Sequence, residues 1–367
     1  MGIPLVDLKA QLAQIEPEVR EGWDRVLANT AFILGGEVAA FEEAFAAFSG
    51  VAHCAGVGNG TDALELGLRA VGVGPGDEVI VPVNTFIASA LAISRAGATP
   101  VFVDSDARTH LLDLAQVEAK IGPRTKALMP VHLYGQCAPM AEVLAIAEKA
   151  GVPVIEDAAQ AQGAKQGGRT AGSFGAIAGT SFYPGKNLGA FGDGGAVLTD
   201  SEPLARKVKA LRNYGSEVKY HHPETGFNSR LDALQAVVLR VKLARLSGWN
   251  AARREAAKRY DELLAGLEGV TPPETVPGNE HIWHLYVIEV DERDRVLASL
   301  NEQGIGAGIH YPVPVHLQGA YAHLGQGEGA FPVAEAAAKR IVSLPMFGEI
   351  TAAQQEQVVH ALAKALG

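Results

Sequence analysis

The sequence has little of what marks secreted, membrane-spanning or nucleic-acid-binding proteins. It contains only two cysteines, Cys54 and Cys137, which lack the spacing of a metal site and suit the cytoplasm as reduced, buried thiols. No apolar run reaches the roughly 18 residues that a membrane helix requires, and no signal peptide is apparent. The formal net charge of −10 at pH 7 argues against nucleic acids and anionic membranes as partners. We therefore expect a cytoplasmic protein with no nucleic-acid or membrane partner.

The composition is that of an ordinary globular protein, with 48% hydrophobic and 20% charged residues in a chain of 367. That length accommodates one large domain and a smaller one. Between residues 78 and 156 apolar strands alternate with helical segments, a pattern typical of an α/β fold with a mostly parallel sheet between helices. The expected strands are 78–82, 99–103, 126–130 and 152–156; the expected helices are 87–96, 113–121 and 139–149.

The segments on either side complete the expected domain organisation. Helical spacing covers residues 7–28 and 37–48, and a helix from Arg230 to about Leu264 leads out of the large domain. The boundary near residue 246 gives a large domain at 1–246 and a small C-terminal α/β domain at 247–367, with which the N-terminal helix could pack. In the small domain we expect strands at 282–290 and 307–309 and helices at 291–303 and 333–340.

A single lysine lies at the centre of a loop that is too rich in glycine and proline for a helix. The stretch from Thr180 to Gly195 reads T-S-F-Y-P-G-K-N-L-G-A-F-G-D-G-G, with an expected strand ending at Ser181-Phe182. Desolvation in such a turn lowers the pKa of Lys186 and makes a neutral amine available to attack a carbonyl, which is Schiff-base chemistry. The alternative is a solvated surface lysine.

An acidic residue follows the buried strand that begins at Val152. Asp157 lies just past the expected carboxyl end of this strand, where ligands gather in open α/β sheets. A carboxylate at that position can touch a cofactor, although Asp157 could equally cap a helix.

A third stretch, residues 56–68, predicts an anion site. Gly58, Gly60 and Thr61 come immediately before a helical pattern, and the exposed N–H groups of a helix start favour a phosphate. The stretch lacks the glycine patterns of nucleotide-binding loops, and an ordinary helix cap is the alternative. A phosphate cradle, an acid and a lysine are together the three attachments that pyridoxal phosphate requires.

Two further stretches read as functional loops. Residues 308–318, G-I-H-Y-P-V-P-V-H-L-Q, hold His310, Tyr311 and His316 in a stiff polar loop suited to hydroxyl or phosphate recognition, unless the loop is merely solvated. Residues 213–230 form a long irregular excursion, and such loops are usually functional. It contains two adjacent histidines but no second group of ligands, so we expect no metal site.

Four motifs together resemble those of the nucleotide-sugar aminotransferases, which belong to the aspartate aminotransferase superfamily of fold type I. The resemblance extends from P-L-V-D-L near the start to S-L-P-M at 343–346, nearly the whole chain. The motifs are the S-F-Y-P-G-K-N-L-G-A-F-G-D-G-G that contains Lys186, E-D-A-A-Q at 156–160, N-G-T-D-A-L at 59–64 and N-S-R-L-D-A-L-Q-A at 228–236.

The resemblance implies roles for residues that the sequence alone leaves open. It implies that Phe86 stacks on the cofactor ring, where a simple packing role is the alternative, and that Gln160 lies beside the ring hydroxyl. Ser181 would join the phosphate site with Gly60 and Thr61. The resemblance also implies a homodimer in which Asn228 reaches the phosphate of the neighbouring subunit. The substrate residues that we infer with its help are Tyr183, His310, Tyr311 and His316.

The resemblance further implies an aminotransferase that uses pyridoxal phosphate and takes its amino group from L-glutamate. The acceptor would be a nucleotide-linked keto sugar, and F-Y-P-G-K-N-L-G with H-Y-P-V-P is most similar to enzymes acting on C-3 ketones of dTDP-linked 6-deoxyhexoses. Enzymes acting on C-4 ketones, or on UDP-linked 3-keto sugars, are the alternatives. Arg212 and Arg230 are candidates for binding the donor carboxylate. A related dehydratase has histidine in place of the lysine, and a non-catalytic sensor is the remaining alternative.

Overall fold

The large sheet of the computed structural model, which describes residues 2–367, is built from two hydrogen-bonded groups of strands. One group has the order β1-β9-β8-β5 and the other β3-β2-β4, and parallel bridges such as Val131 to Asp157 connect β5 to the end of β4. Pairing is parallel except along β9, which is antiparallel to both neighbours. The strands are β1 His53–Val57, β2 Glu78–Pro82, β3 Thr99–Val103, β4 Thr125–Leu128, β5 Ile155–Asp157, β8 Ile177–Ser181 and β9 Gly195–Thr199.

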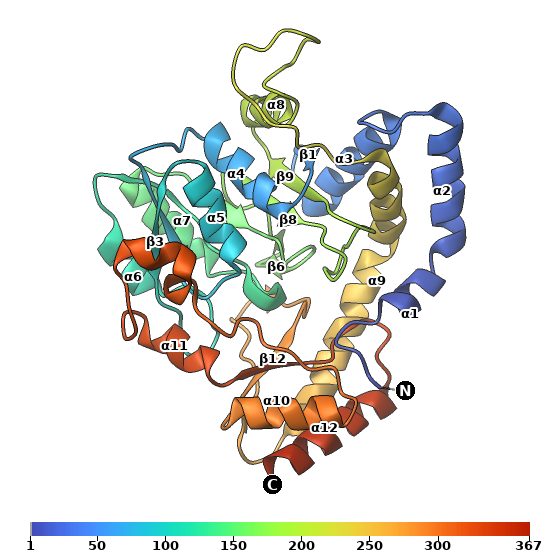
Figure 1. Cartoon of the computed structure of the whole chain (residues 1–367), viewed down its shortest axis with the longest axis vertical. Helices are drawn as coiled ribbons and strands as arrows, with labels where there is room; N and C mark the ends of the chain where they lie inside the picture. The colour runs from blue at the N-terminus through green and yellow to red at the C-terminus, as the bar shows by residue number, and fades with distance from the viewer. Residues whose placement is uncertain (1) are drawn as a thin grey trace.

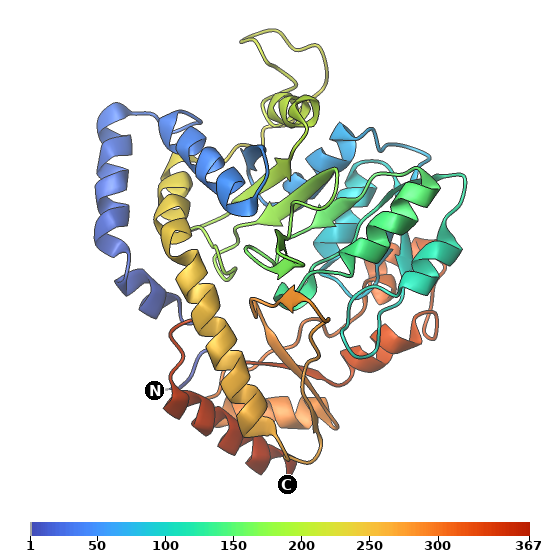
Figure 2. The ribbon, with the colours of Figure 1, turned by 180° about the vertical axis from the view of Figure 1, so that it is seen from behind.

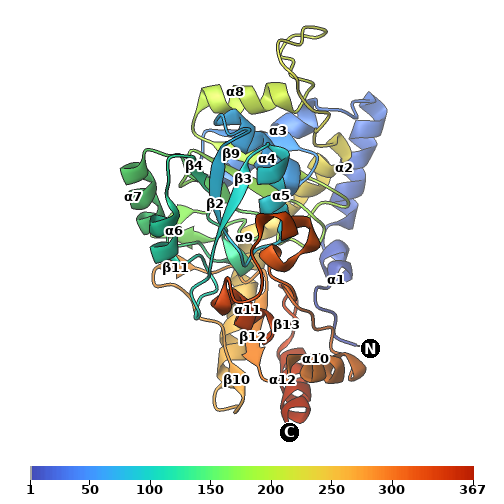
Figure 3. The ribbon, with the colours of Figure 1, turned by 60° about the vertical axis from the view of Figure 1, so that its left-hand side comes forward.

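Helices cover both faces of this sheet because its strands are apolar on both sides. Along β2, for example, Val79 and Val81 pack in the core formed with α4 and α5, whereas Ile80 packs in the core formed with α6 and α7. Figure 3 shows β2 and β3 between these helices. The covering helices are α3 Gly36–Ser49, α4 Gly60–Ala70, α5 Ile87–Arg95, α6 Leu114–Lys120, α7 Met140–Ala150, α8 Glu202–Leu211 and α9 Ala233–Leu264.

A second, smaller layer lies at the far end of α9. Its antiparallel sheet has the order β10-β12-β13, and its core includes Tyr260 and Leu264 from α9. Figures 1 and 2 show α9 running from the large sheet down to α12, with α2 beside its upper part. The elements not yet given are α1 Leu8–Ala13, α2 Glu16–Asn29, β6 Lys165–Gln166, β7 Arg169–Thr170, β10 Val270–Thr271, β11 Asn279–Glu280, β12 Tyr286–Val290, α10 Arg293–Glu302, α11 Pro332–Ala338, β13 Ile341–Leu344 and α12 Ala352–Leu366.

The expected α/β fold is confirmed, and four expected elements differ from the structure. The strand at 152–156 begins only at Ile155 and continues through Asp157. The helix at 7–28 is broken before Glu16, because Pro17 fits only the first turn of a new helix. The strand at 282–290 begins only at Tyr286, since Trp283 has a left-handed backbone. The strand expected at 307–309 is wrong: Gly308 forms a single bridge to Ser343, and the chain then enters the proline-containing loop.

The expected domain boundary near residue 246 falls inside α9, which continues unbroken across it, and the boundary remains a prediction. The N-terminal segment does contact the small layer, since Ile3 pairs with Ile305 and lies in the same core. Among residues 2–367 no helix is both long enough and apolar enough to cross a membrane.

Candidate active site

The candidate site lies at one edge of the large sheet, where several chain segments leave it. Strands β2, β5 and β8 are parallel, and β1 is parallel to β8 because β9 is antiparallel to both. Their carboxyl ends therefore share one edge. Asp157 is the last residue of β5, and the segments that follow β2, β8 and β1 carry Phe86, Lys186 and the glycine-rich stretch before α4.

Asp157 is the last residue of β5, and its side chain is almost fully buried. One carboxylate oxygen accepts a hydrogen bond of 2.6 Å from the Ser89 hydroxyl, and the other accepts one of 3.1 Å from the Ala159 N–H. Burial raises the pKa of Asp157, and these two bonds together with the nearby charge of Lys186 oppose that rise. Asp157 is thus bonded at a strand end and beside an amine, rather than capping a helix.

Lys186 is half-buried in the loop after β8. Its backbone N–H donates to the backbone carbonyl of Tyr183 at 2.8 Å. Burial lowers the pKa of Lys186 to about 8, while the carboxylate of Asp157 acts in the opposite direction. A substantial part of this amine is therefore neutral in mildly alkaline solution. The charge of Lys186 in turn helps burial to lower the pKa of His310 to about 4 and that of His284 well below its usual value.

The start of α4 is where the sequence predicts an anion site. The Asn59 side chain accepts the N–H of Asp62 at 2.9 Å, which leaves the first N–H groups of the helix, on Gly60 and Thr61, for another acceptor. A side chain at Gly60 would approach Ser181 Cβ to 2.5 Å, so only glycine lets α4 lie so close to the end of β8. This close approach places Ser181 at the start of the helix.

Polar and aromatic groups link the 308–318 loop to the large sheet. The Gln160 side chain accepts the Tyr134 N–H at 2.7 Å and donates to the Tyr311 hydroxyl at 3.0 Å. The Tyr311 ring lies 5.4 Å from that of Phe86, which is 52% exposed. His310 bonds to the Ser343 hydroxyl at 2.8 Å through Nδ1. An exposed aromatic ring therefore flanks a surface formed by both parts of the chain.

Two other residues of the predicted site, His316 and Arg212, are buried in contacts outside this group. His316 is buried, with its Nε2 3.0 Å from Glu335 and its ring against Phe331. Arg212 is buried in an ion pair with Glu42, so its charge is already compensated. Tyr183 is 61% exposed at the start of the lysine loop.

Asn228 lies at the base of the 213–230 excursion, which projects from the molecule beyond α8 (Figures 1–3). Its side chain is exposed and accepts a hydrogen bond from Arg230, whose charge the amide does not neutralise. The neighbouring Ser229 is buried and bonds to Gly58 and Asp62 at the start of α4 in the same chain. The two adjacent residues thus differ in exposure and in partners.

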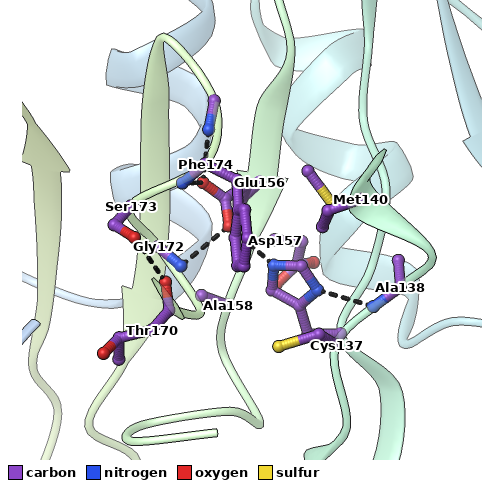
Figure 4. A network of polar contacts seen from close by, with 12 residues as sticks. Cys137, Ala138, Met140, Glu156, Asp157, Ala158, Thr170, Gly172, Ser173 and Phe174 are labelled. Atoms are coloured by element: carbon purple, nitrogen blue, oxygen red, sulfur yellow. Dashed lines mark hydrogen bonds and ion pairs between the residues drawn. The ribbon is translucent and has the colours of Figure 1, made fainter. Parts of the chain in front are cut away.

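A buried carboxylate supports β5 directly next to Asp157. Glu156 is fully buried and accepts four hydrogen bonds of 2.7–2.8 Å. Three come from the backbone N–H groups of Gly172, Phe174 and Gly175, and one comes from His132, whose other ring nitrogen accepts the Ala138 N–H at 3.0 Å. Figure 4 shows this network. The backbone N–H of His132 donates to the backbone carbonyl of Asp157 at 3.0 Å, so the network fixes the strand end that carries Asp157.

We expect Glu156→Ala to lower the free energy of unfolding by about 3 kcal/mol or more, because it leaves buried donors without an acceptor. The measurement is the shift in the denaturant midpoint of the cofactor-free protein at a fixed protein concentration. Glu118→Ala is the matched control, since it removes an exposed ion pair with Lys149, and such surface pairs contribute little to stability. Equal shifts for the two variants would contradict the supporting role of Glu156.

The donor set of the site matches pyridoxal phosphate. The free N–H groups of the α4 start suit a phosphate, Asp157 suits a protonated ring nitrogen, and the amine of Lys186 suits an aldehyde. No group of three or more histidine, cysteine or acidic side chains within residues 2–367 is arranged to hold a metal ion. His284, which bonds to Asn187 at 3.2 Å, and Ser89 belong to the site although neither lies in a motif that the sequence analysis recognised.

Comparison with known proteins agrees with this chemistry. Residues 13–363 match the DegT/DnrJ/EryC1/StrS aminotransferase family. Among solved structures, the chain is similar to DesV from S. venezuelae, determined in complex with a ketimine intermediate. The two share 46% identity and a TM-score of 0.97, over 99% of this chain and 98% of that one.

Three curated relatives have different names. A dTDP-3-amino-3,4,6-trideoxy-alpha-D-glucose transaminase from Streptomyces venezuelae is 47% identical over 98% of this chain and 95% of its own. A UDP-N-acetyl-3-dehydro-alpha-D-glucosamine 3-aminotransferase from Acidithiobacillus ferrooxidans is 49% identical over 97% of this chain and 95% of its own. A "pleiotropic regulatory protein" from Geobacillus stearothermophilus is 48% identical over 99% of this chain and 98% of its own.

Proposed function

Since the chain belongs to the DegT/DnrJ/EryC1/StrS aminotransferase family, we propose that it moves an amino group from L-glutamate to the C-3 ketone of a nucleotide-linked keto-6-deoxyhexose. The family uses pyridoxal phosphate. The observation that supports the proposal is that the buried Asp157 carboxylate, the loop of Lys186 and the N–H groups at the start of α4 all lie at the carboxyl ends of neighbouring strands. We expect this chemistry to take place in the cytoplasm.

Different residues of the site would bind different parts of the cofactor. Gly60, Thr61 and Ser181 would hold its phosphate, and Asp157 would hold the proton on its ring nitrogen. Phe86 would stack on the ring and Gln160 would bond to the ring hydroxyl. When bound, pyridoxal phosphate supplies an aldehyde that accepts the amino group and a ring that accepts the electron pair left when a proton is removed.

Lys186 would act as the general base and acid. Its neutral amine would take the proton from Cα of glutamate, and in the second half of the cycle its ammonium group would return a proton to C-3 of the sugar. A pKa of about 8 suits both tasks, because neither the neutral nor the charged amine is then rare near pH 8. Asp157 would remain ionised throughout.

The sugar would be recognised by Tyr183, His310 and Tyr311, which lie on the lysine loop and on the 308–318 loop. His316 is omitted from this set because its side chain is enclosed and paired with Glu335. We favour dTDP as the nucleotide on the basis of the loop motifs and the relative from Streptomyces venezuelae. A UDP-linked 3-keto sugar is the main alternative, because the relative from Acidithiobacillus ferrooxidans is about as similar.

A sensor function also has some support, since one relative is named as a regulatory protein. The two functions are separated by adding L-glutamate to protein loaded with pyridoxal phosphate. An aminotransferase converts the bound cofactor to its amine form and releases one equivalent of 2-oxoglutarate per site. A sensor leaves the cofactor and the glutamate unchanged. Absence of 2-oxoglutarate with glutamate, and of the corresponding 2-oxo acid with every other amino donor, would contradict the proposed function.

We further propose a two-fold dimer in which Asn228 of one chain contacts the cofactor phosphate held by the other. The proposal is supported by the projecting excursion and the exposed Asn228 amide. Two-fold symmetry is the commonest symmetry of homo-oligomers, and it makes each such contact twice. The anchoring of Ser229 beside the anion site of its own chain makes the opposite outcome, in which Asn228 serves its own site, a real alternative.

Mixing two inactive variants distinguishes these arrangements. When Lys186→Met and Asn228→Ala chains exchange subunits, a contact across the interface gives each mixed dimer one intact site. About half of the dimers are then mixed, so we expect activity to recover to about a quarter of wild type. The test requires Asn228→Ala to be inactive alone and subunit exchange to be verified by mass. No recovery would contradict the shared site.

A further inference from the structure

Two buried hydroxyl groups connect the start of α5 to the carboxylate of Asp157. Ser89 is fully buried in the first turn of this helix, and its Oγ lies 2.6 Å from Asp157 Oδ2. An ionised carboxylate can only accept, so the Ser89 hydroxyl must be the donor. This bond is short, as expected for a hydroxyl bonded to a charged acceptor.

The hydroxyl oxygen of Ser89 is also hydrogen-bonded to a second hydroxyl group, that of Thr85. Thr85 Oγ1 lies 2.7 Å away and is also buried. Because the single proton of Ser89 is used on Asp157, Thr85 is the donor in this second bond. The Phe86 carbonyl lies 3.3 Å from Ser89 Oγ and competes for the same proton, but it is a longer and neutral acceptor. The hydrogen bonds therefore run in one direction, from Thr85 through Ser89 to Asp157.

We propose that Thr85 and Ser89 are positioning residues that hold the Asp157 carboxylate ionised and correctly oriented for the ring nitrogen of the cofactor. The inference rests on the proposed role of Asp157 and adds the residues that keep its carboxylate ionised and oriented. With one bond to Ser89 and one to the Ala159 N–H, each carboxylate oxygen keeps a free lone pair. The carboxylate can thus accept a further proton donor without losing its support.

The charges around Asp157 show why such support is needed. Burial opposes its ionisation, and the neighbouring Glu156 and the hydroxyl of Tyr311 bring no positive charge. The positive charge of Lys186 favours the ionised form, but the amine of Lys186 is needed in its neutral form for proton transfer. The hydroxyl pair supplies stabilisation that does not depend on the protonation of Lys186.

The test compares the binding of pyridoxamine phosphate with that of its analogue in which carbon replaces the ring nitrogen. We expect Ser89→Ala to weaken binding of pyridoxamine phosphate about tenfold at pH 7, the loss that follows from removing a hydrogen bond to a charged group, and to leave binding of the analogue unchanged. Thr85→Val should also weaken binding of pyridoxamine phosphate and not of the analogue, but by a smaller factor than Ser89→Ala. Ser94→Ala is the matched control, because it removes a hydroxyl from the same helix that bonds only to Tyr321. It should change neither affinity.

A pH profile provides the second readout. Without the Ser89 donor the pKa of Asp157 rises, so the acidic limb of kcat/KM should move to higher pH in Ser89→Ala and stay in place in Ser94→Ala. Equal loss of both ligands in Ser89→Ala, or an unmoved acidic limb, would overturn the proposal. Asp157→Asn, measured beside them, separates the two inferences: if it discriminates between the ligands and Ser89→Ala does not, only the positioning role fails. If Asp157→Asn does not discriminate either, the proposed role of Asp157 itself fails.

Discussion

Replacing Lys186 by methionine is expected to slow transamination by about 10⁴-fold, the upper end of what general acid–base catalysis contributes, because it removes the proposed proton-transfer group. Methionine keeps the length and the apolar stem of lysine, so the fold and the anion site should persist. The measurement is amino-sugar formation, together with borohydride reduction of the loaded protein. Reduction should fix the cofactor to the wild-type peptide that contains residue 186 and to no peptide of the variant.

Lys242 offers a matched control for this experiment. It is also buried, and burial lowers its pKa to about 8, but it packs over the ring of Phe191 at 4.9 Å. Lys242→Met should retain activity within a few-fold and should leave the borohydride labelling at residue 186. If Lys186→Met turned over normally, or if labelling moved to Lys242, the assignment of the catalytic lysine would be wrong. The pair also shows that burial of a lysine alone does not define the site.

Asp157→Asn is expected to bind the cofactor and yet slow turnover by about 10²–10³-fold, because an amide cannot hold the ring nitrogen positively charged. The measurement is the rate of each half-reaction in single turnover, which excludes product release from the comparison. Asp113→Asn is the control, since Asp113 caps α6 by accepting the N–H groups of Ala115 and Gln116. Asparagine caps helices as well as aspartate, so this change should be nearly neutral. A similarly small effect of Asp157→Asn would mean that Asp157 has only a local structural role.

The parallel part of the large sheet follows from patterns that are local in the sequence. Runs such as Glu78–Pro82 are apolar on both faces and short, and their alternation with helices predicts parallel pairing. Because parallel strands end at the same edge, the positions of Phe86, Asp157 and Lys186 near one another were predictable before any coordinates. Where backbone conformation overrides composition, as at Trp283, the expected strand was wrong.

The supporting residues could not be predicted in the same way. Ser89, His132 and His284 act through contacts with residues far along the chain, such as the bond from Ser89 to Asp157 across 68 positions. A buried serine in a helix has no distinctive spacing. His310 and His316 show the same limit on one loop, since His310 bonds to Ser343 and His316 is enclosed against Glu335. Side-chain direction in an irregular loop depends on tertiary packing that spacing does not encode.

The central claim, amino transfer to C-3 of a nucleotide-linked sugar, is tested most directly by a single-turnover panel. The protein is loaded with pyridoxamine phosphate and mixed separately with dTDP-linked 3-keto and 4-keto 6-deoxyhexoses and with a UDP-linked 3-keto sugar. Conversion of the cofactor to its aldehyde form is followed by absorbance, and the amino sugar is identified by mass and NMR. Our account predicts the fastest conversion with the dTDP-linked 3-keto sugar, giving a 3-amino product. Conversion by the 4-keto sugar alone, or by none of the three, would contradict it.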